Sequence, residues 1–269
     1  MAISTGAATA LQLTTELSAV LGNRLPDIPE LAAVIEPFLE ARRVPEDIVF
    51  RINMAVDELL TNAITYGYRD DARHLIRVNV AVADEVIDVN IEDDAVAFDP
   101  FERDEVDVSR DIEERQIGGL GIHLVKEMLQ YANYRRVGDR NRIALRQSFV
   151  AVAEPQLQKG AVMSDLQRSV LLAPSGRLDA NTSADFEKEV MQQLSLAPSG
   201  MVMDFSGLRY VSSAGLRVVL LAAKKLKAAG GTFVLCGLSS SIEEVFKISG
   251  FLSILTVEPD RDAAMTHFA

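Results

Sequence analysis

A predicted helix contains the stretch Ala55-Val-Asp-Glu-Leu-Leu-Thr-Asn-Ala-Ile-Thr-Tyr-Gly67, which combines an apolar stripe with polar side chains beside it. Pro45 opens this helix and Gly67 ends it. The apolar residues recur at intervals of three and four, so one face of the helix is expected to be buried. Glu58 and Asn62 are four residues apart and therefore lie one above the other at the edge of that face.

A carboxylate and an amide in this arrangement can hold a hydrated Mg²⁺ ion, which takes few protein oxygen ligands and completes its shell with water and phosphate. The same two residue types are also common on the solvated flank of an ordinary helix. Glu58 and Asn62 alone therefore do not separate a metal site from a plain helix surface.

A second stretch, Val89-Asn-Ile-Glu-Asp-Asp-Ala-Val-Ala-Phe-Asp-Pro100, is typical of a strand that runs out into a turn. An aspartate at the end of such a strand, here Asp93, can accept a hydrogen bond from the amino group of adenine inside an apolar pocket. The alternative is that Asp93 and Asp94 only shape the turn.

A third stretch, Gln116-Ile-Gly-Gly-Leu-Gly-Ile-His-Leu-Val-Lys-Glu-Met128, leads a group of glycines into a helix. Backbone N–H groups at the start of a helix suit a phosphate chain. The stretch lacks the Gly-Lys-Ser/Thr of a P-loop, and charged residues 107–115 precede it where a dinucleotide-binding turn would have a strand. We expect that charged segment to form a lid over bound phosphates.

Hydrophobic patterning around these stretches predicts a helix over 29–41, paired strands over 76–82 and 86–91, and a strand–turn–strand unit over 134–149. Residues 151–164 have no sustained periodicity and are expected to link two domains. Beyond them, strands and helices alternate within about 100 residues, which implies a largely parallel sheet with helices packed on it.

The composition narrows the class of protein. Of the 269 residues, 48% are hydrophobic, yet no apolar run reaches the ~18 residues that suggest a membrane span. No signal peptide is expected, and the single cysteine, Cys236, is expected in the core, so the chain is predicted to be cytoplasmic and free of membrane attachment. Residues 156–269 contain 11 basic and 11 acidic side chains, so residues 1–155 hold the whole net charge of −12. Such an acidic domain repels phosphate backbones, which argues against direct binding of nucleic acid.

In their order and spacing, the three stretches resemble the GHKL ATPase superfamily, which includes gyrases, histidine kinases and heat-shock chaperones. The runs AVDELLTNAITYGY, FDP and IGGLGIHLVK are similar to the anti-sigma-factor serine kinases, and the resemblance covers roughly residues 20–148. It implies that Glu58 orients or deprotonates a substrate hydroxyl, that Asn62 binds Mg²⁺ and that Asp93 fixes the adenine of ATP. It also implies that the phosphates are cradled by Gly118, Gly119, Leu120 and Gly121.

The sequence departs from this family at Ala95, because members usually have glycine two residues after the adenine-binding aspartate. A methyl group there would cost about 1 kcal/mol or more if the backbone needs a positive φ or lies against the nucleotide, and nothing if the turn is relaxed. Ala95 is therefore counted among the predicted nucleotide-binding residues, and its effect on ATP affinity stays open.

The second half resembles the STAS domain (sulfate transporter and anti-sigma antagonist) over about residues 166–262. The resemblance rests on Gly176-Arg-Leu-Asp179 and on Asp204-Phe-Ser-Gly-Leu-Arg-Tyr-Val-Ser-Ser-Ala-Gly-Leu-Arg217. In the antagonists, the partner kinase phosphorylates a serine at the start of the following helix, and Ser213 holds that position. Ser212, where the family often has aspartate, is the alternative acceptor. Both serines could instead simply cap the helix.

The sequence thus predicts an α/β protein of two domains. Residues 1–150 are expected to form a GHKL-type α/β sandwich with a mixed sheet and helices on one face. Residues 151–164 are the linker, and residues 165–269 a small STAS-type α/β domain. The resemblance implies an ATP- and Mg²⁺-dependent serine kinase or anti-sigma module, fused to a domain that is its substrate, through Ser213, or its internal regulator.

The partners implied by the resemblance are a sigma factor or other regulated protein, a separate STAS-domain antagonist and a PP2C-type phosphatase, with homodimerisation as a further hypothesis. The alternative function is a non-catalytic nucleotide-binding module that controls the docking of a partner. A sensor histidine kinase is rejected, because neither His74 nor His123 lies on a two-helix dimerisation hairpin.

Overall fold

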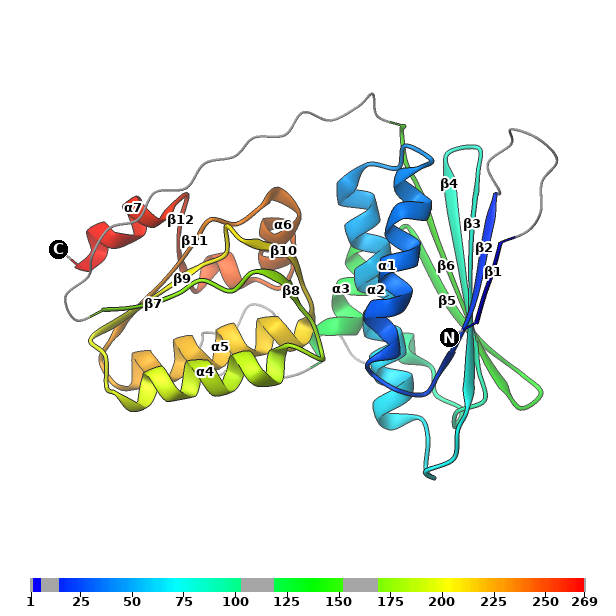
Figure 1. Ribbon diagram of the computed structural model, residues 1–269, viewed down its shortest axis with the longest axis horizontal. Coiled ribbons are helices and arrows are strands. Elements are labelled where there is room, and N and C mark those ends of the chain that lie inside the picture. Colours follow the sequence, from blue (N-terminus) through cyan, green and yellow to red (C-terminus); the bar gives the residue numbers. More distant parts are fainter. Residues whose placement is uncertain (1, 6–14, 103–118, 152–168, 269) are drawn as a thin grey trace. The chain divides into compact units, whose positions relative to one another are not determined.

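The computed structural model describes residues 2–5, 15–102, 119–151 and 169–268 (Figure 1). These residues fall into two compact units, one that includes 15–102 and 122–151 and another that includes 169–268. The predicted lid and all of the predicted linker except Ala151 lie outside the described residues. None of the described helices combines the length and the hydrophobicity that crossing a membrane requires.

The N-terminal unit is built on a six-stranded sheet. Its strands are β1 (Ala2–Thr5), β2 (Glu16–Gly22), β3 (Leu75–Ala83), β4 (Val86–Asp93), β5 (Tyr131–Val137) and β6 (Arg140–Ser148). They pair in the order β1-β2-β3-β4-β6-β5, and every pair is antiparallel. The prediction of a mixed sheet is therefore wrong for the described strands: hairpins join β3 to β4 and β5 to β6, and β2–β3 and β4–β6 are also antiparallel although helices lie in the connections between them.

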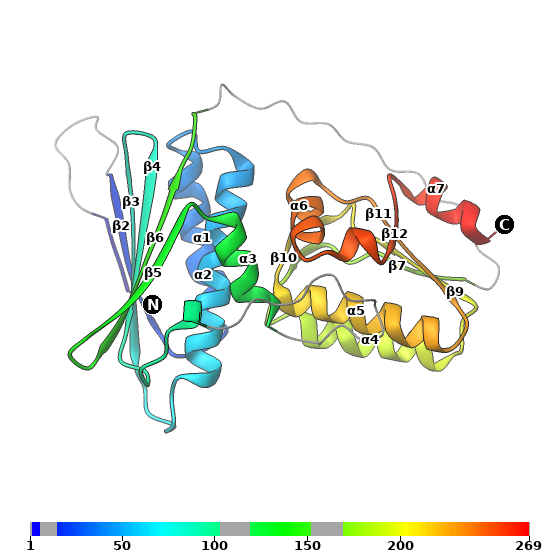
Figure 2. The same cartoon turned by 180° about the vertical axis from the view of Figure 1, so that it is seen from behind.

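Helices cover one face of this sheet (Figures 1 and 2). They are α1 (Asp27–Glu40), α2 (Glu46–Tyr66) and α3 (Leu120–Met128), and a short 3₁₀ turn, η1 (Pro100–Glu102), follows β4. Helix α2 has Pro45 at its N-cap and Gly67 at its C-cap, which confirms both predicted ends. Acidic Glu46 and Asp47 lie in its first turn, where the helix dipole favours negative charge.

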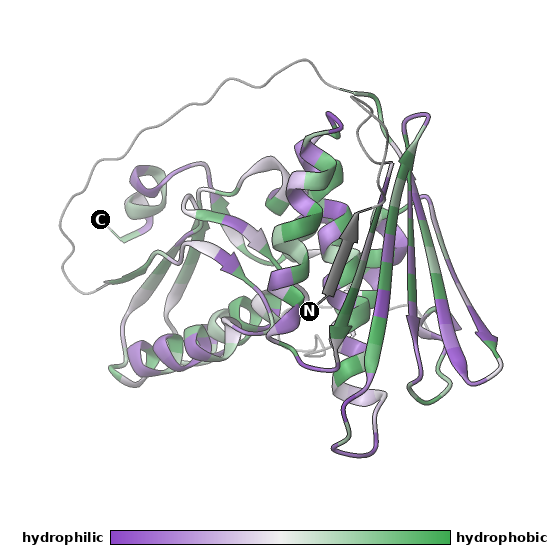
Figure 3. Cartoon of the chain, turned by 45° about the vertical axis from the view of Figure 1, so that its right-hand side comes forward, coloured by the Kyte–Doolittle hydropathy of each residue, from purple (hydrophilic) through white to green (hydrophobic). Residues whose placement is uncertain are grey.

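The core of the N-terminal unit lies between the helices and the inner face of the sheet. Ile52 of α2 is fully buried in it, together with Ile87 and Val89 of β4 and Val125 of α3. Successive strand residues point to opposite faces, so hydrophobic and hydrophilic side chains alternate along the strands (Figure 3). This alternation leaves the last inward position of β4 to Asp93, a polar residue.

Strand β2 was not predicted, although its sequence carries the signal. Leu17, Ala19 and Leu21 face the core, while the residues between them are more exposed. The alternation of hydrophobic and polar residues is weak in the sequence because Ala19 is small and Val20, on the other face, is apolar. Pairing with β3 over the whole strand fixes its register.

The C-terminal unit contains two parallel sheets, which agrees with the predicted largely parallel arrangement. Its strands are β7 (Ser169–Leu172), β8 (Gly176–Leu178), β9 (Gly200–Asp204), β10 (Leu208–Val211), β11 (Thr232–Cys236) and β12 (Thr256–Glu258). The larger sheet has the order β12-β11-β9-β7, and β8 pairs with β10. Residues 169–178 form two strands in different sheets, β7 and β8, and Pro174 lies in the break between them.

The helices of this unit are α4 (Ser183–Ser195), α5 (Ser213–Ala228), α6 (Ser240–Ile248) and α7 (Arg261–Met265), and two 3₁₀ turns are η2 (Phe251–Ser253) and η3 (Thr266–Phe268). Helices α4 and α5 lie side by side on one face of the larger sheet, and α7 lies on the other (Figure 1). Ala264 of α7 packs against Val202 and Val234. Cys236 is fully buried, as predicted, and burial raises the pKa of its thiol to about 12.

We expect Ile52→Ala to lower the free energy of unfolding of the N-terminal unit by about 2–5 kcal/mol, because it removes fully buried methyl groups from the centre of α2. Val150→Ala is the control, because Val150 is 77% exposed, and it should change stability by no more than about 0.5 kcal/mol. Urea denaturation followed by circular dichroism measures both. Equal effects of the two substitutions would contradict the assignment of α2 to the core.

Candidate functional site

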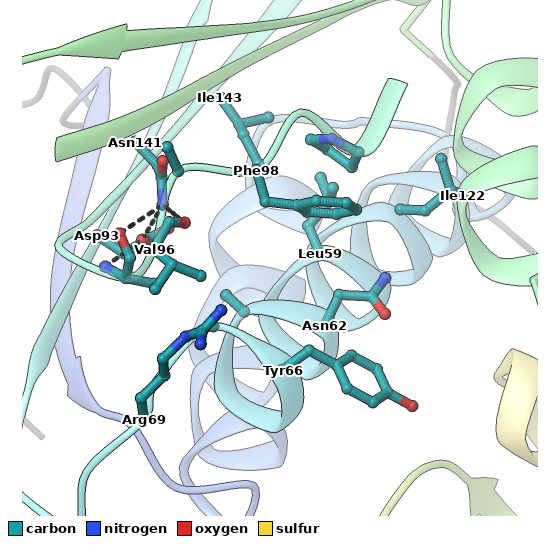
Figure 4. Close-up of a pocket in the computed structure, with 15 residues that line it drawn as sticks. Leu59, Asn62, Tyr66, Arg69, Asp93, Val96, Phe98, Ile122, Asn141 and Ile143 are labelled. Atoms are coloured by element: carbon teal, nitrogen blue, oxygen red, sulfur yellow. Dashed lines mark hydrogen bonds between the residues drawn. The ribbon is translucent and has the colours of Figure 1, made fainter. Parts of the chain in front are cut away.

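A cavity of about 330 Å³ opens beside α2 in the N-terminal unit. Its lining includes Asn62 of α2, Asp93 at the end of β4, Asn141 near the start of β6 and Ile122 of α3 (Figure 4). The volume falls within the range of small-molecule pockets, which combine apolar walls with a few polar groups. The cavity thus brings together Asn62 and Asp93, which the sequence placed in separate stretches.

Asp93 is the only acidic residue among the described residues that line the cavity, and it is 2% exposed. Its Oδ1 accepts hydrogen bonds from the backbone N–H of Ala95 at 2.9 Å and from Nδ2 of Asn141 at 2.7 Å (Figure 4). Within the part of the chain that the structure describes, no hydrogen bond reaches Oδ2. The pKa of Asp93 is raised, chiefly by burial and also by the charge of Asp94, and these two hydrogen bonds and the charge of Arg136 offset part of that shift.

The two roles that the sequence suggested for Asp93, binding adenine and shaping the turn, are compatible. The hydrogen bond from the N–H of Ala95 is the local turn that an aspartate makes with the backbone two residues on. The same carboxylate lines the cavity. Shaping the turn occupies one oxygen and leaves the other for a ligand.

Ala95 packs against Gly67, the residue that ends α2. A Cβ atom on Gly67 would lie 2.7 Å from Cβ of Ala95, so the missing side chain of Gly67 makes room for the methyl group. The backbone of Val96 donates a hydrogen bond to the carbonyl of Gly67 at 2.9 Å, which fastens the turn to the helix end. Ala95 is not one of the described residues with positive φ. The cost that a positive φ would impose on alanine at this position therefore does not arise, and the effect of the methyl group on a bound nucleotide stays open.

Asn62 and Glu58 have different surroundings. Asn62 lines the cavity and is partly exposed. Glu58, one turn earlier on α2, is 6% exposed and is not among the described residues that line the cavity. The predicted pair therefore shares one side of the helix, but only its amide faces the cavity.

The glycine-rich stretch is described from residue 119 onward, so the predicted contact of Gly118 lies outside the described residues. Gly119 has φ +81°, a conformation that glycine adopts without strain. Leu120 and Gly121 begin α3, and Leu120 is buried. None of these three lines the cavity in the described part of the chain, and α3 reaches it through Ile122.

Aromatic side chains border the cavity. Tyr66, in the last turn of α2, is 75% exposed, and Phe98, after β4, is 44% exposed. Exposed aromatic rings beside an apolar pocket offer flat surfaces on which a ring-shaped ligand can stack. Arg69 adds a positive charge to the lining from the loop that follows α2 (Figure 4).

A histidine joins that loop to the end of β4. His74 contacts Asp70 through Nε2 at 2.9 Å and Asp94 through Nδ1 at 3.1 Å, and its ring stacks on Tyr68 with centroids 4.5 Å apart. The hydrogen bond with Asp70, followed by that with Asp94, raises the pKa of His74. Because Asp94 directly follows Asp93, this contact ties the loop that carries Arg69 to the polar end of the cavity.

Asn141, Arg136 and Tyr134 are part of the site but were not predicted from the sequence. Asn141 occupies an inward position of β6, on the same face as Ile143 and Leu145, next to the turn at Gly138. A single polar residue at an inward position beside a hairpin turn is a signal that could have been read. The hydrogen-bond partners of Asn141 could not be predicted, because they depend on the register of β6 with both β4 and β5.

In the C-terminal unit, Ser212 is the N-cap residue of α5 and Ser213 is the first residue of the helix. Ser212 is 2% exposed, and its hydroxyl has no hydrogen-bond partner among the described residues, so its side chain does not cap the helix. Its N–H donates to the carbonyl of Leu178 at 2.9 Å. Ser213 is partly exposed. Of the two candidate acceptors, Ser213 is the more accessible.

Comparison with known families agrees with this division. Residues 22–147 match the family described as the histidine kinase-like ATPase domain, and residues 161–264 match the STAS domain. The chain is a histidine kinase-like ATPase domain joined to a STAS domain. The ATPase domain contains the cavity, and the STAS domain contains Ser212 and Ser213.

Three related proteins show what each part resembles. The chain is 40% identical over 106 residues to BtrV of Bordetella bronchiseptica, which is named as an anti-sigma factor antagonist; the match covers 39% of this chain and 91% of BtrV. It is 22% identical over 96 residues to the serine/threonine-protein kinase BtrW of the same organism, covering 36% of this chain and 68% of BtrW. It is 27% identical over 82 residues to the serine-protein kinase RsbW of Listeria monocytogenes, covering 29% of this chain and about half, 52%, of RsbW. The N-terminal domain thus resembles proteins named as serine kinases, and the STAS domain resembles a protein named as an anti-sigma factor antagonist.

The histidine bridge predicts a measurable titration. Since Asp70 is the leading cause of the raised pKa of His74, we expect Asp70→Asn to move the titration of His74 down toward the ordinary value of 6.5. The stabilisation from this bridge is complete below that ordinary pKa and is lost as pH rises through the raised pKa. Two-dimensional NMR of the histidine ring protons measures the midpoint directly.

Asp71→Asn is the matched control, because it removes a neighbouring carboxylate from the same loop and should leave the His74 midpoint in place. An unchanged midpoint in Asp70→Asn would show that the bridge does not hold His74 in solution.

Proposed function

We propose that the histidine kinase-like ATPase domain binds ATP with Mg²⁺ in the cavity beside α2. The observation that carries this proposal is Asp93, a buried carboxylate at the polar end of the cavity with one oxygen engaged by the protein. Its Oδ2 would accept a hydrogen bond from the amino group of adenine. Tyr66 and Phe98 border the cavity where the flat base would stack.

The residues present fit this ligand. The cavity, about 330 Å³, holds a ligand of nucleoside size with its phosphates extending outward. Asn62 supplies an amide oxygen for the metal, and the described residues contain no cluster of acidic side chains and histidines that would bind a metal by itself. Mg²⁺ would therefore depend on the phosphates as ligands. Gly119 at positive φ and the N-terminus of α3 supply backbone N–H groups for the phosphates.

The proposed reaction is transfer of the γ-phosphoryl group to a serine. The hydroxyl oxygen of Ser213, or of the equivalent serine in a separate STAS protein, bonds to the γ-phosphorus as the bond to the ADP oxygen breaks. Glu58 would take the hydroxyl proton, and Mg²⁺, held by Asn62 and the phosphates, would supply positive charge against the negative charge that develops. Ser213 is the proposed acceptor rather than Ser212, because it is the more exposed of the two.

As a regulator, the chain would switch between partners according to the phosphorylation of a STAS domain. Residues 1–150 would be the kinase or anti-sigma domain, 151–164 the linker and 165–269 the antagonist. Fusion raises the effective concentration of the two domains to about millimolar if the linker can span the sites. We propose a sigma factor or another regulated protein as the target, a separate STAS antagonist and a PP2C-type phosphatase as further partners, and a homodimer as the assembly.

A second candidate is a nucleotide-binding module that controls docking without transferring phosphate. One observation favours it: Glu58, the proposed base, does not line the cavity in the described part of the chain. Intact Asn62 and Asp93 are compatible with both candidates, since both require a bound nucleotide.

Intact-mass spectrometry after incubation with Mg-ATP separates the two. We expect a gain of one phosphate by the unmodified protein, and its loss in Ser213→Ala and in Glu58→Ala, because one variant lacks the acceptor and the other the base. Ser212→Ala is the matched control and should still gain the phosphate. Tandem mass spectrometry then locates the modified residue.

If the unmodified protein gains no phosphate while still binding ATP, self-phosphorylation is wrong, and the separate STAS antagonist is the substrate to try next. A gain that persists in Glu58→Ala would remove Glu58 from the proposed mechanism. A gain lost only in Ser212→Ala would assign the acceptor to the buried serine.

We also expect Asp93→Asn to weaken ATP binding by about tenfold or more, because the lost hydrogen bond to a charged group contributes about 1.5–3 kcal/mol. Fluorescence titration with a labelled ATP analogue measures the affinity. Asp94→Asn, which changes the neighbouring carboxylate outside the cavity lining, is the control. Equal losses in both variants would contradict a direct contact of Asp93 with the base.

A further inference from the structure

A hydrogen-bond network on the β5–β6 hairpin holds Asp93 in place. Asn141 of β6 is 5% exposed, and its Nδ2 lies 2.7 Å from Oδ1 of Asp93, 3.3 Å from the carbonyl of Ala95 and 3.2 Å from the carbonyl of Val96. One amide group therefore contacts the carboxylate and both residues of the turn that closes this end of the cavity (Figure 4).

The orientation of the Asn141 amide is set by its other neighbours. Its Oδ1 accepts hydrogen bonds from Nη1 of Arg136 at 2.7 Å and from the hydroxyl of Tyr134 at 2.9 Å. A guanidinium can only donate, so the oxygen of the amide must face Arg136 and the nitrogen must face Asp93. Arg136 also donates to the carbonyl of Ala95 at 2.8 Å, which joins the hairpin to the same turn a second time.

The hydrogen bonds that this network makes to Asp93 end on Oδ1, and Oδ2 stays available to a ligand. Both hydrogen bonds that Asp93 accepts from described residues end on Oδ1. Because Asn141 can neither flip nor move away without breaking several contacts, it holds the carboxylate group in one orientation. An ionised carboxylate in that orientation accepts a hydrogen bond through Oδ2, whereas a carboxyl protonated at Oδ2 presents an O–H donor there and is a much weaker acceptor.

We propose that Asn141 is a positioning residue for base recognition, which fixes the Asp93 carboxylate and keeps it in the accepting, ionised form, with Arg136 and Tyr134 holding the amide. This inference rests on the proposed binding of ATP in the cavity. It adds to that proposal the side chain that holds Asp93 ready to accept a hydrogen bond from the base. It also assigns a role to the β5–β6 hairpin, which lies outside the three stretches of sequence first associated with the nucleotide.

The surroundings of Asp93 determine the direction in which its pKa changes when Asn141 is removed. Burial raises the pKa of Asp93, and the nearby carboxylate of Asp94 acts in the same sense. The hydrogen bond from Asn141, then that from Ala95, and the charge of Arg136 lower it. Tyr68 also lies close to Asp93, and burial together with Asp93 and Asp94 raises its pKa, so it stays neutral. Arg69 lines the same cavity, and His74, whose pKa is raised, bonds to Asp94. Removing Asn141 therefore shifts the balance toward the protonated carboxyl.

The test is ATP affinity as a function of pH, measured on the full chain by isothermal titration calorimetry with Mg-ATP from about pH 5.5 to about pH 8. Asn141→Leu removes the donor while keeping the number and branching of the side-chain heavy atoms, and Asn133→Leu makes the same substitution at an exposed position of the same hairpin. The ratio of the two affinities at each pH cancels the titration of the nucleotide itself.

We expect Asn141→Leu to bind ATP about tenfold more weakly than Asn133→Leu near pH 8, the loss typical of one hydrogen bond to a charged group. The ratio should widen as pH falls, because Asp93 gains its proton at a higher pH in Asn141→Leu. Asn141→Thr, which keeps one donor for Asp93 and suits a strand, should recover most of the affinity and the pH profile of the unmodified chain.

Arg136→Gln keeps the test decisive if Asn141→Leu fails to fold. Arg136 lies on the protein surface, and its replacement by Gln should weaken ATP binding as Asn141→Leu does, more strongly at acidic pH. A ratio that is constant with pH, or no loss of affinity in Asn141→Leu, would overturn the positioning role while ATP binding by the unmodified chain stands. Absence of ATP binding by the unmodified chain would overturn the proposed function, and the inference with it.

Discussion

The ATPase domain depends on the burial of one carboxylate, that of Asp93, at the last inward position of β4. A charge in an apolar core is tolerated only when hydrogen bonds satisfy it. The donors come from two places, the backbone of the turn at Ala95 and the side chain of Asn141 on β6. The antiparallel register of β4 with β6 places Asp93 directly opposite Asn141, so the sheet itself delivers the partner that the carboxylate needs.

The rest of the cavity follows from this pairing. Once Asp93 is fixed, the turn after β4 is held against the end of α2, where Gly67 leaves space for Ala95 and accepts a hydrogen bond from Val96. Helix α2 then presents Asn62 to the same cavity, one turn before its end. Alanine is accommodated at this turn because its φ is not positive and because Gly67, at the neighbouring helix end, has no side chain to meet the methyl group.

Features of the structure that depend on residues close together in the sequence could be predicted, whereas features that depend on distant segments could not. Pro45 and Gly67 act within their own turns, so the ends of α2 were predictable, as was the adjacency of Asp93 to a turn. The antiparallel order of the sheet, the strand β2 and the break of 169–178 into two strands depend on pairing between distant segments. Asn141 shows the same limit: its inward position could be read from alternation, but its contact with Asp93 spans 48 residues of sequence and required the register.

The proposed binding of ATP depends on the orientation of the Asp93 carboxylate toward the bound adenine. A crystal structure of the full chain with a non-hydrolysable ATP analogue and Mg²⁺ tests it most directly. We expect the exocyclic amino nitrogen of adenine to lie within about 3.2 Å of Oδ2 of Asp93, with Asn141 still bonded to Oδ1. A base bound elsewhere, or one that meets Asp93 only after Asn141 has turned away, would contradict this proposal.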